Sequence, residues 1–310
     1  MKLLAENNYV LGIDIGGTNI RAGLVDANYN LSNFVIESST QIMDPNHAAE
    51  KLTLFIQKYL EEQGRDKNIA AISIGFPSTI DKSRKKVLST PNIAGFDNLD
   101  IVDELEERLL IKTFINRDVN MLMMFDMYKG SVPDDGITAG FYLGTGLGNA
   151  ISINGHLLIG KNGAAAELGH IPSRGHDDAC GCGNRGCVET FASGKYLRKL
   201  CDENFEHTFI GDVFTKHKDS PIIKKFIREL AIPIATEINI LDPHYIILGG
   251  GVIQMEGFPF EELELAIHEF ARKPYPEQNL EFLYSVPGQE NGVIGAGIYA
   301  FKEVKTQSLF

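Results

Sequence analysis

The chain has 310 residues, which is long enough for about two domains of ordinary size. It carries 29 basic and 41 acidic side chains, a formal net charge of −12 that repels nucleic-acid phosphates and disfavours a nucleic-acid-binding role. The sequence has neither a run of about 18 apolar residues nor a signal-peptide pattern, and its four cysteines do not resemble a disulfide framework, so we expect a cytoplasmic protein outside the membrane.

The first half of the chain alternates strand and helix patterns. Two β-branched apolar runs joined by a glycine-rich turn predict a hairpin over 9–26. Helical spacing of apolar residues follows over 47–63, then a buried strand over 69–77. A short amphipathic helix over 101–110, a strand from 113 and a helix over 120–128 complete this half.

The second half repeats the opening theme. A second strand, glycine-rich turn and strand over 136–155 lie about 130 residues after the first hairpin, which suggests two related halves. A polar, loop-rich segment over 163–190 carries three cysteines, and helical patterns around 195–201 and 221–240 lead to a buried strand and glycine turn over 245–252. A last helix is predicted around 293–303, so strands alternate with helices as in layered α/β proteins.

Three glycine clusters are candidates for phosphate binding. They are DIGGTN (14–19), LGTGLGN (143–149) and LGGGV (248–252). Turns without side chains expose backbone N–H groups that can surround phosphate oxygens, while the carboxylate of Asp14 and the hydroxyl of Thr18 suit Mg²⁺ and a phosphate. The alternative for a single turn is a hairpin that merely needs a tight bend. Two turns of the same chemistry favour the phosphate site.

The cysteine-rich segment predicts a structural zinc site. Cys180, Cys182 and Cys187 together with His170 form a Cys₃His set, the closed four-ligand arrangement of structural zinc. His176 competes for the fourth position, and spacing alone does not separate the two histidines. Reduced cysteines that bind no metal are the alternative.

Three carboxylates are further candidates. Glu167 and Glu189 flank the cysteine segment and could hold the hydroxyls of a polyol, or they could be solvated surface charges. Asp118 follows an apolar strand, where a carboxylate opening into a cleft can act as general base in phosphoryl transfer, although an isolated Asp is more often a cap or turn residue.

Taken together, these motifs resemble the ROK family of sugar kinases and repressors. DIGGTN, DVN, GTGLG, ELGH, CGCGNRGCVE and ILGGGV follow in the family's order across nearly the whole chain. The resemblance implies a two-lobed α/β fold of the actin/hexokinase/Hsp70-like (ribonuclease H-like) class with a zinc-stabilised loop. We expect an N-terminal lobe over 1–117, a second lobe over 118–293 with the zinc loop over 163–190, and a C-terminal helix over about 294–310 that packs back on the first lobe.

The resemblance also implies an enzyme that closes over a hexose and ATP with Mg²⁺. Asp118 would take the proton of the sugar's 6-hydroxyl, and His170 would serve both sugar and zinc. The cofactor-binding residues that it implies are Asp14, Gly16, Gly17, Thr18, Asn19, Gly144, Thr145, Gly146, Gly249 and Gly250. The sugar-binding residues that it implies are Thr90, Asn92, Arg117, Glu167, His170 and Glu189. A homodimer is expected on the same basis.

One departure from the family pattern concerns specificity. Arg117 stands where most sugar kinases of the family have Asn, which normally contacts a ring hydroxyl, so the preferred hydroxyl orientation should change. RDVNM, ELGHIP and DPHYIILGGGV resemble D-allose kinases, and N-acetylmannosamine kinase or glucokinase is the alternative. A sugar-responsive repressor of the same family would need a helix-turn-helix before the first hairpin, and the thirteen residues before Asp14 are too few for one.

Overall fold

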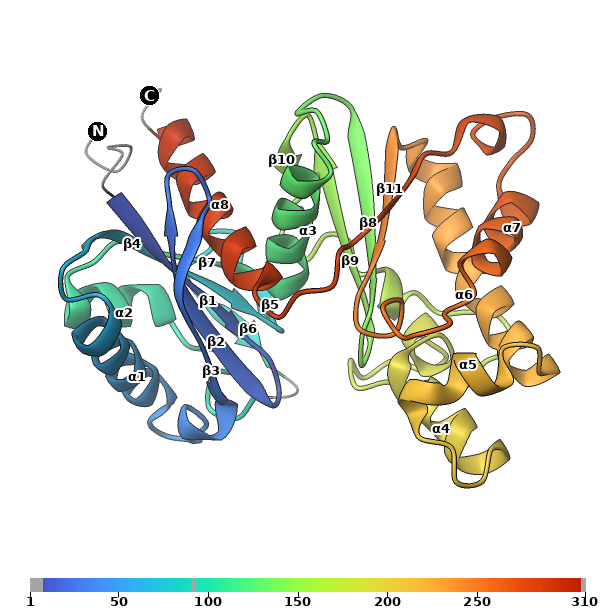
Figure 1. The fold of residues 1–310 in the computed structure, drawn as a ribbon, viewed down its shortest axis with the longest axis horizontal. Helices are drawn as coiled ribbons and strands as arrows, with labels where there is room; N and C mark the ends of the chain where they lie inside the picture. The colour runs from blue at the N-terminus through green and yellow to red at the C-terminus, as the bar shows by residue number, and fades with distance from the viewer. Residues whose placement is uncertain (1–7, 91–92, 308–310) are drawn as a thin grey trace. The chain divides into compact units, whose positions relative to one another are not determined.

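The computed structural model describes residues 8–90 and 93–307, which divide into two compact units (Figure 1). The first unit holds the described residues up to 131 together with 159–165 and 288–307, and the second holds 132–158 and 166–287. None of the helices in the described part combines the length and apolar character needed to cross a membrane.

The first unit is built on a five-stranded sheet in the order β3-β2-β1-β4-β7. Its strands and helices are β1 (Asn8–Ile15), β2 (Asn19–Asp26), β3 (Leu31–Ser38), α1 (Ala48–Gln63), β4 (Asn68–Phe76), β5 (Thr79–Ile80), β6 (Val87–Ser89), α2 (Ile101–Leu109), β7 (Thr113–Arg117), α3 (Asp118–Lys129) and α8 (Asn291–Gln307), with a short 3₁₀ helix η1 (Ser39–Gln41). β1, β2 and β3 are antiparallel, whereas β1, β4 and β7 run parallel. The carboxyl ends of these three parallel strands therefore meet at one edge of the sheet.

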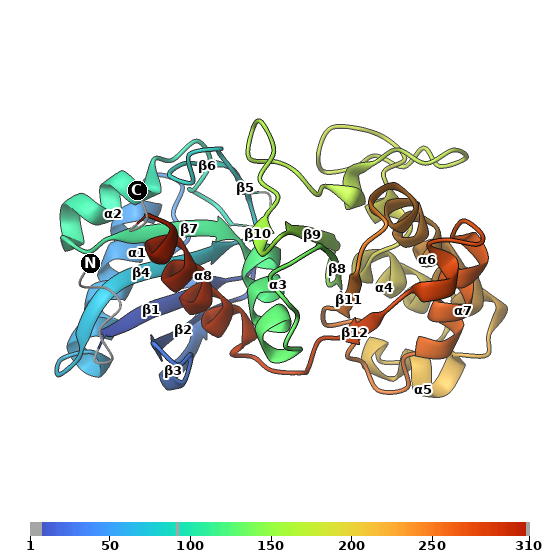
Figure 2. The same ribbon diagram turned by 90° about the horizontal axis from the view of Figure 1, so that it is seen from above.

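Successive residues of β1 lie on opposite faces of this sheet, as in any β-strand. Leu11, Ile13 and Ile15 are fully buried in a core shared with α1 and α2. Gly12 points to the other face, where α8 crosses β1 and β4 (Figure 2). A Cβ at Gly12 would lie 2.3 Å from the carbonyl oxygen of Val293, so only glycine lets α8 approach the strand this closely.

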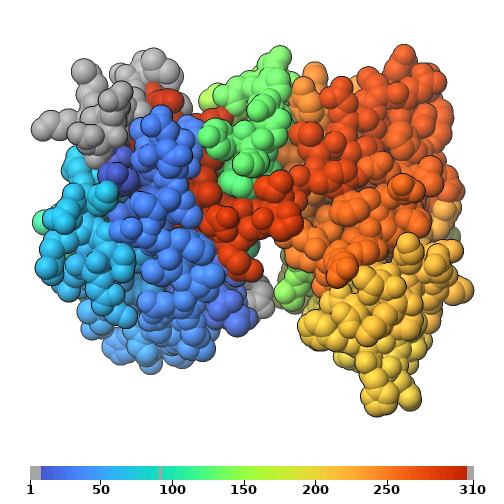
Figure 3. Space-filling model, viewed as in Figure 1, coloured from blue at the N-terminus to red at the C-terminus, as the bar shows by residue number. Residues whose placement is uncertain are grey.

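The second unit repeats this design, with strand order β10-β9-β8-β11-β12. Its elements are β8 (Ile137–Leu143), β9 (Leu147–Ile153), β10 (His156–Leu157), α4 (Gly194–Asn204), α5 (Val213–His217), α6 (Pro221–Leu241), β11 (Tyr245–Gly249), α7 (Phe260–Phe270) and β12 (Phe282–Tyr284), with 3₁₀ helices η2 (Leu168–His170), η3 (Val188–Thr190), η4 (Ile210–Asp212) and η5 (Glu277–Asn279). β8 and β9 form the predicted second hairpin, and β11 and β12 add parallel strands beside β8. α6 and α7 pack together, and the space-filling view shows α7 at the surface of this unit (Figure 3).

The division of the chain differs from the expected boundary after residue 117. α3 packs against α8, so residues 118–131 belong to the first unit. The two helices are so close that a Cβ at Gly295 would lie 1.9 Å from the carbonyl oxygen of Met121. Residues 159–165 also belong to the first unit, although the residues on both sides of them belong to the second. The sequence pattern of strands and helices does not reveal this.

Candidate functional site

Two carboxylates stand at the carboxyl ends of parallel strands in the first unit. Asp14 is near the end of β1, and Asp118 begins α3 directly after β7. Gly75 of β4 lies between them, where a Cβ would be 3.4 Å from the Cα of Asp118 and 3.7 Å from Oδ1 of Asp14. Both acids therefore border a residue without a side chain, and the charge of Asp14 is close enough to affect the pKa of Asp118.

The surroundings of Asp118 suit proton transfer. Burial, reinforced by the nearby charge of Asp14, raises the pKa of Asp118 from 3.8 to about 7. The N–H of Val119, 2.8 Å from Oδ1, and the charge of Arg117 act in the opposite direction. A carboxyl with a pKa near 7 is well matched to accept a proton from a hydroxyl at neutral pH.

Asp14 has partners that the sequence patterns do not single out. Burial raises the pKa of Asp14, and Arg21 of β2 opposes this shift with Nη1 3.4 Å from Oδ2. Arg21 in turn donates from Nε and Nη2 to Oε1 of Gln289, at 2.9 and 2.7 Å. A Cβ at Gly292 would lie 2.7 Å from Cγ of Asp14, so the start of α8 also borders this acid. The antiparallel register of the hairpin, which pairs Asp14 with Arg21, could have identified the arginine.

Backbone and hydroxyl hydrogen bonds fix the base of the first glycine turn, residues 16–19. The N–H of Gly16 donates to the carbonyl of Asn19 at 2.8 Å. Ser39 donates its hydroxyl to the carbonyl of Gly16 at 2.6 Å and its N–H to that of Thr18 at 3.0 Å. Gly17 and Thr18 are exposed at the tip. The turn is therefore fixed at its base and open at its tip, as binding of an oxygen-rich ligand requires.

Arg117 and Thr90 also lie in the first unit, and both are buried. Arg117 is 8% exposed, and its Nη1 donates to the carbonyl of Ala165 at 2.9 Å. The hydroxyl of Thr90 donates to the carbonyl of Ile93 at 2.8 Å, and its N–H donates to Oδ1 of Asp97 at 2.6 Å. Both side chains thus contact neighbouring chain segments. The predicted sugar-binding Asn92 lies outside the described residues.

The second glycine turn, Gly144–Gly146, joins β8 to β9 in the second unit. The N–H groups of Gly194 and Lys195, in the first turn of α4, donate to the carbonyls of Gly144 and Thr145 at 2.9 Å each. Gly146 contacts the carboxylate of Glu189, since a Cβ there would lie 2.0 Å from Oε2. Loop, helix and carboxylate together fix the path of this turn.

The third glycine cluster adjoins the second turn. Gly250 has φ of +95°, and a Cβ there would lie 2.5 Å from the carbonyl oxygen of Leu143. That carbonyl also accepts the N–H of Val252 at 2.9 Å. Gly249 ends β11, which pairs with β8. The structure thus brings the predicted nucleotide residues of this unit to one end of its sheet.

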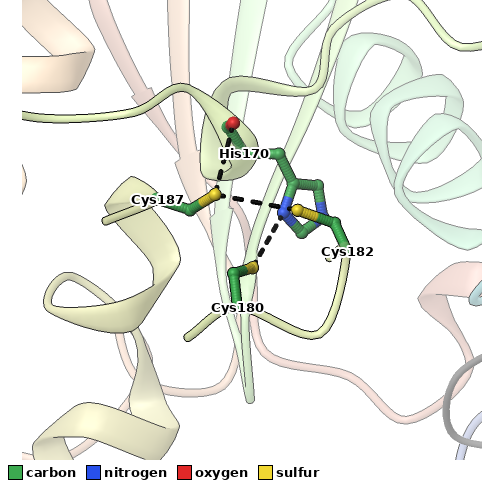
Figure 4. Close-up of side chains that lie close together, drawn as sticks. All are labelled: His170, Cys180, Cys182 and Cys187. Carbon is green, nitrogen blue, oxygen red and sulfur yellow. Dashed lines mark hydrogen bonds between the residues drawn. The ribbon is translucent and has the colours of Figure 1, made fainter. Parts of the chain in front are cut away.

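The predicted cysteine cluster forms in the second unit (Figure 4). His170, Cys180, Cys182 and Cys187 each offer one ligand atom, and these atoms lie within 4.8 Å of one another. Sγ of Cys182 lies 3.7 Å from Sγ of Cys187, and Sγ of Cys180 lies 3.5 Å from Nδ1 of His170. A tetrahedron with Zn–S bonds of about 2.3 Å has edges of about 3.8 Å, so the spacing and the donor set fit a zinc ion.

His170, and not His176, lies in this cluster. The ring of His176 stacks on Phe191 with centroids 3.7 Å apart. His170 turns Nδ1 to the sulfur atoms, while its Nε2 lies 3.9 Å from Oε2 of Glu167. Metal-bound histidines commonly direct the second ring nitrogen to a carboxylate in this way. Glu167, His170 and Glu189 therefore all lie on the segment that the cluster would fix.

The chain is similar to known proteins over most of its length. Residues 10–303 match the ROK family. A glucokinase of Thermotoga maritima is 25% identical over 308 residues, which covers 93% of this chain and 95% of the relative. An N-acetyl-D-glucosamine kinase of Histophilus somni is 30% identical, with 83% of this chain and 88% of the relative covered. A ROK family glucokinase of Streptomyces griseus, solved with glucose and AMPPNP, has a TM-score of 0.78 at 25% identity, with 95% of this chain and 99% of that chain covered.

The match spans both units, from β1 to α8. The structural likeness confirms the two-lobed actin/hexokinase-like fold that the sequence motifs implied. From its motifs, its fold and these relatives, the chain belongs to the ROK family.

Proposed function

We propose that the protein is a hexose kinase that transfers the γ-phosphoryl group of ATP to the 6-hydroxyl of its sugar. The observation that carries this proposal is Asp118, a carboxyl with a pKa of about 7 that borders Asp14 at the edge of the first sheet. A base poised near neutral pH beside a second acid suits phosphoryl transfer, where one group takes a proton and the other serves a metal ion.

The chain's own residues divide this work. Asp118 accepts the proton of the 6-hydroxyl, which makes that oxygen a nucleophile toward phosphorus. Asp14 and the turn over 16–19 hold the transferring phosphate with Mg²⁺, which when bound would neutralise phosphate charge. Arg21 keeps the carboxylate of Asp14 in place. The turn over 144–146, with Gly249 and Gly250, holds the nucleotide.

The sugar side of the proposal rests on the cysteine segment. Glu167, His170 and Glu189 would form hydrogen bonds with sugar hydroxyls, and Thr90 and Arg117 are the other sugar-binding residues that we propose. The Cys₃His cluster would hold Zn²⁺, which when bound would stabilise a polar segment and take no part in phosphoryl transfer.

We further propose D-allose as the preferred sugar. Arg117 supports this choice, because a buried guanidinium stands where most kinases of the family have Asn. Allose differs from glucose only in the orientation of the 3-hydroxyl, and a changed hydrogen-bond partner can discriminate such an epimer. N-acetylmannosamine and glucose are the competing substrates.

The test is ADP release in a coupled assay with matched concentrations of D-allose, D-glucose, N-acetylmannosamine and D-fructose. The Asp118→Asn protein serves as the blank. Preference for allose supports the specificity proposal, whereas preference for another sugar retains the kinase and removes allose. Absence of sugar-dependent ADP release with specific binding to duplex DNA would point instead to a sugar-responsive regulator.

A further inference from the structure

Leu147, the first residue after the second glycine turn, has both of its backbone polar groups close to the cysteine segment. Its N–H donates to Oε2 of Glu189 at 3.3 Å. On the other side, Gly169 comes so close that a Cβ there would lie 2.6 Å from the carbonyl oxygen of Leu147. Gly169 belongs to η2 and Glu189 to η3, so two arms of the cysteine segment enclose this residue.

The two arms are joined to each other. The N–H of Val188 donates to the carbonyl of Ile171 at 3.0 Å, and Sγ of Cys187 lies 3.4 Å from the carbonyl oxygen of His170. His170 ends η2, and Cys187 directly precedes η3. The Cys₃His cluster therefore lies at the junction of the arms. Fixing the cluster fixes the position from which Glu189 reaches the turn.

Glu189 fits the turn closely. Oε2, which accepts the Leu147 N–H, is also the atom that a Cβ at Gly146 would approach to 2.0 Å. The carboxylate thus occupies the space that the absent side chain of Gly146 leaves. Loss of this carboxylate would remove the side-chain acceptor of the Leu147 N–H and leave open the space beside Gly146.

We propose that Glu189 is a positioning residue for the nucleotide: it fixes the Gly144–Gly146 turn through Gly146 and Leu147, in addition to its contact with sugar. This inference rests on the proposed function, in which the turn holds ATP. One side chain would then serve both substrates, so its loss weakens nucleotide binding even when no sugar is present. A residue that contacts only sugar would have no such effect.

The experiment measures binding of ADP with Mg²⁺ by calorimetry, without sugar, to the full-length protein and three variants. Glu189→Ala should weaken binding about fivefold to tenfold, the change expected for loss of one ordinary hydrogen bond of about 1 kcal/mol or slightly more. Glu189→Gln retains an acceptor oxygen and should stay within about threefold of the original protein. Glu167→Gln is the matched control: it removes the other proposed sugar carboxylate and should raise the sugar KM while leaving ADP affinity unchanged.

Hydrogen exchange at the Leu147 amide provides a second readout. We expect faster exchange in Glu189→Ala than in Glu167→Gln, with the zinc content equal in both. Equal ADP affinity and equal Leu147 exchange in the original protein and Glu189→Ala would overturn the inference. If Glu189→Ala does not fold, Gly146→Ala decides through exchange of the Leu147 amide, because its Cβ displaces the carboxylate of Glu189. Unchanged Leu147 exchange in that variant would overturn the inference. If the original protein binds no nucleotide, the proposed function fails, and Leu147 exchange still decides whether Glu189 holds the turn.

Discussion

Replacing Asp118 with Asn should stabilise the folded protein, and the gain should grow with pH. In the unfolded chain this carboxyl ionises at its ordinary pKa of 3.8, and in the folded protein at about 7. Between these values the folded state retains a proton that the unfolded state has lost. Stability therefore falls as pH rises through this window and levels off above pH 7. Asn has no proton to lose and avoids this cost.

The magnitude follows from the two pKa values. Each pH unit of the window is worth about 1.36 kcal/mol, so the shift from 3.8 to about 7 costs the original protein about 4 kcal/mol in total. Most of the loss occurs below pH 6, close to the sequence pI of about 5.2, where the protein is least soluble. Between pH 6 and pH 9 the advantage of the variant should still grow by about 1 to 2 kcal/mol.

The assay is urea denaturation followed by circular dichroism at pH 6 and pH 9, without Mg²⁺ or nucleotide, which would pair with the carboxylate. Comparing the two pH values cancels the fixed difference between Asn and a protonated Asp. Asp219→Asn, at a side chain that is 81% exposed, is the control and should show no growing advantage. A stability difference that is the same at both pH values for Asp118→Asn would refute the assignment of a raised pKa.

Four further outcomes are expected. The kcat/KM of the original protein should rise with pH through about 7, because only ionised Asp118 accepts a proton, and a flat profile over pH 6–8 would contradict this. Removing metal with a chelator, or Cys182→Ser, should lower the melting temperature and raise the sugar KM; an unchanged sugar KM in verified zinc-free protein would separate the cluster from the sugar site. Arg21→Met should lower kcat about tenfold while leaving the sugar KM near its original value, because Arg21 contacts Asp14 and lies outside the proposed sugar site. A raised sugar KM with an unchanged kcat would count against this role. Glu237→Gln should stabilise the protein increasingly from pH 4.5 to 7, because burial raises the pKa of Glu237 to about 7, and circular dichroism melts at pH 6 and 8 would measure the gain.

Local patterns predicted much of this fold. Both hairpins, the helix that ends before Gly64 and the loop-rich cysteine segment lie where alternation and helical spacing place them. These features depend on neighbours in sequence, which is why a single sequence can reveal them. The cysteine spacing likewise predicted three members of the cluster, because a tight glycine-rich loop brings them together.

Contacts between distant segments were not predictable in the same way. The spacing did not decide whether His170 or His176 is the fourth member of the cluster. In the folded loop, His170 directs its ring to the sulfur atoms, whereas the ring of His176 stacks on Phe191. The bond from Nη1 of Arg117 to a carbonyl 48 residues away was likewise outside the reach of local sequence patterns. Gln289 accepts a hydrogen bond from Arg21, 268 residues earlier in the chain, and periodic patterns in the sequence do not predict such a contact.

The glycines of α8 have a consequence for biosynthesis. Gly292 borders Asp14, and Gly295 borders the backbone of α3, the helix that begins with Asp118. Asp14 and α3 therefore obtain part of their surroundings from a helix that the ribosome makes long after them. Strands β1, β4 and β7 can pair on the nascent chain. The face of β1 and β4 that α8 covers stays exposed until residues 291–307 have been synthesised. The first unit therefore cannot finish folding before the second unit has been synthesised. Until α8 emerges from the ribosome, the apolar face around Gly12 is exposed and is a surface that a chaperone can bind.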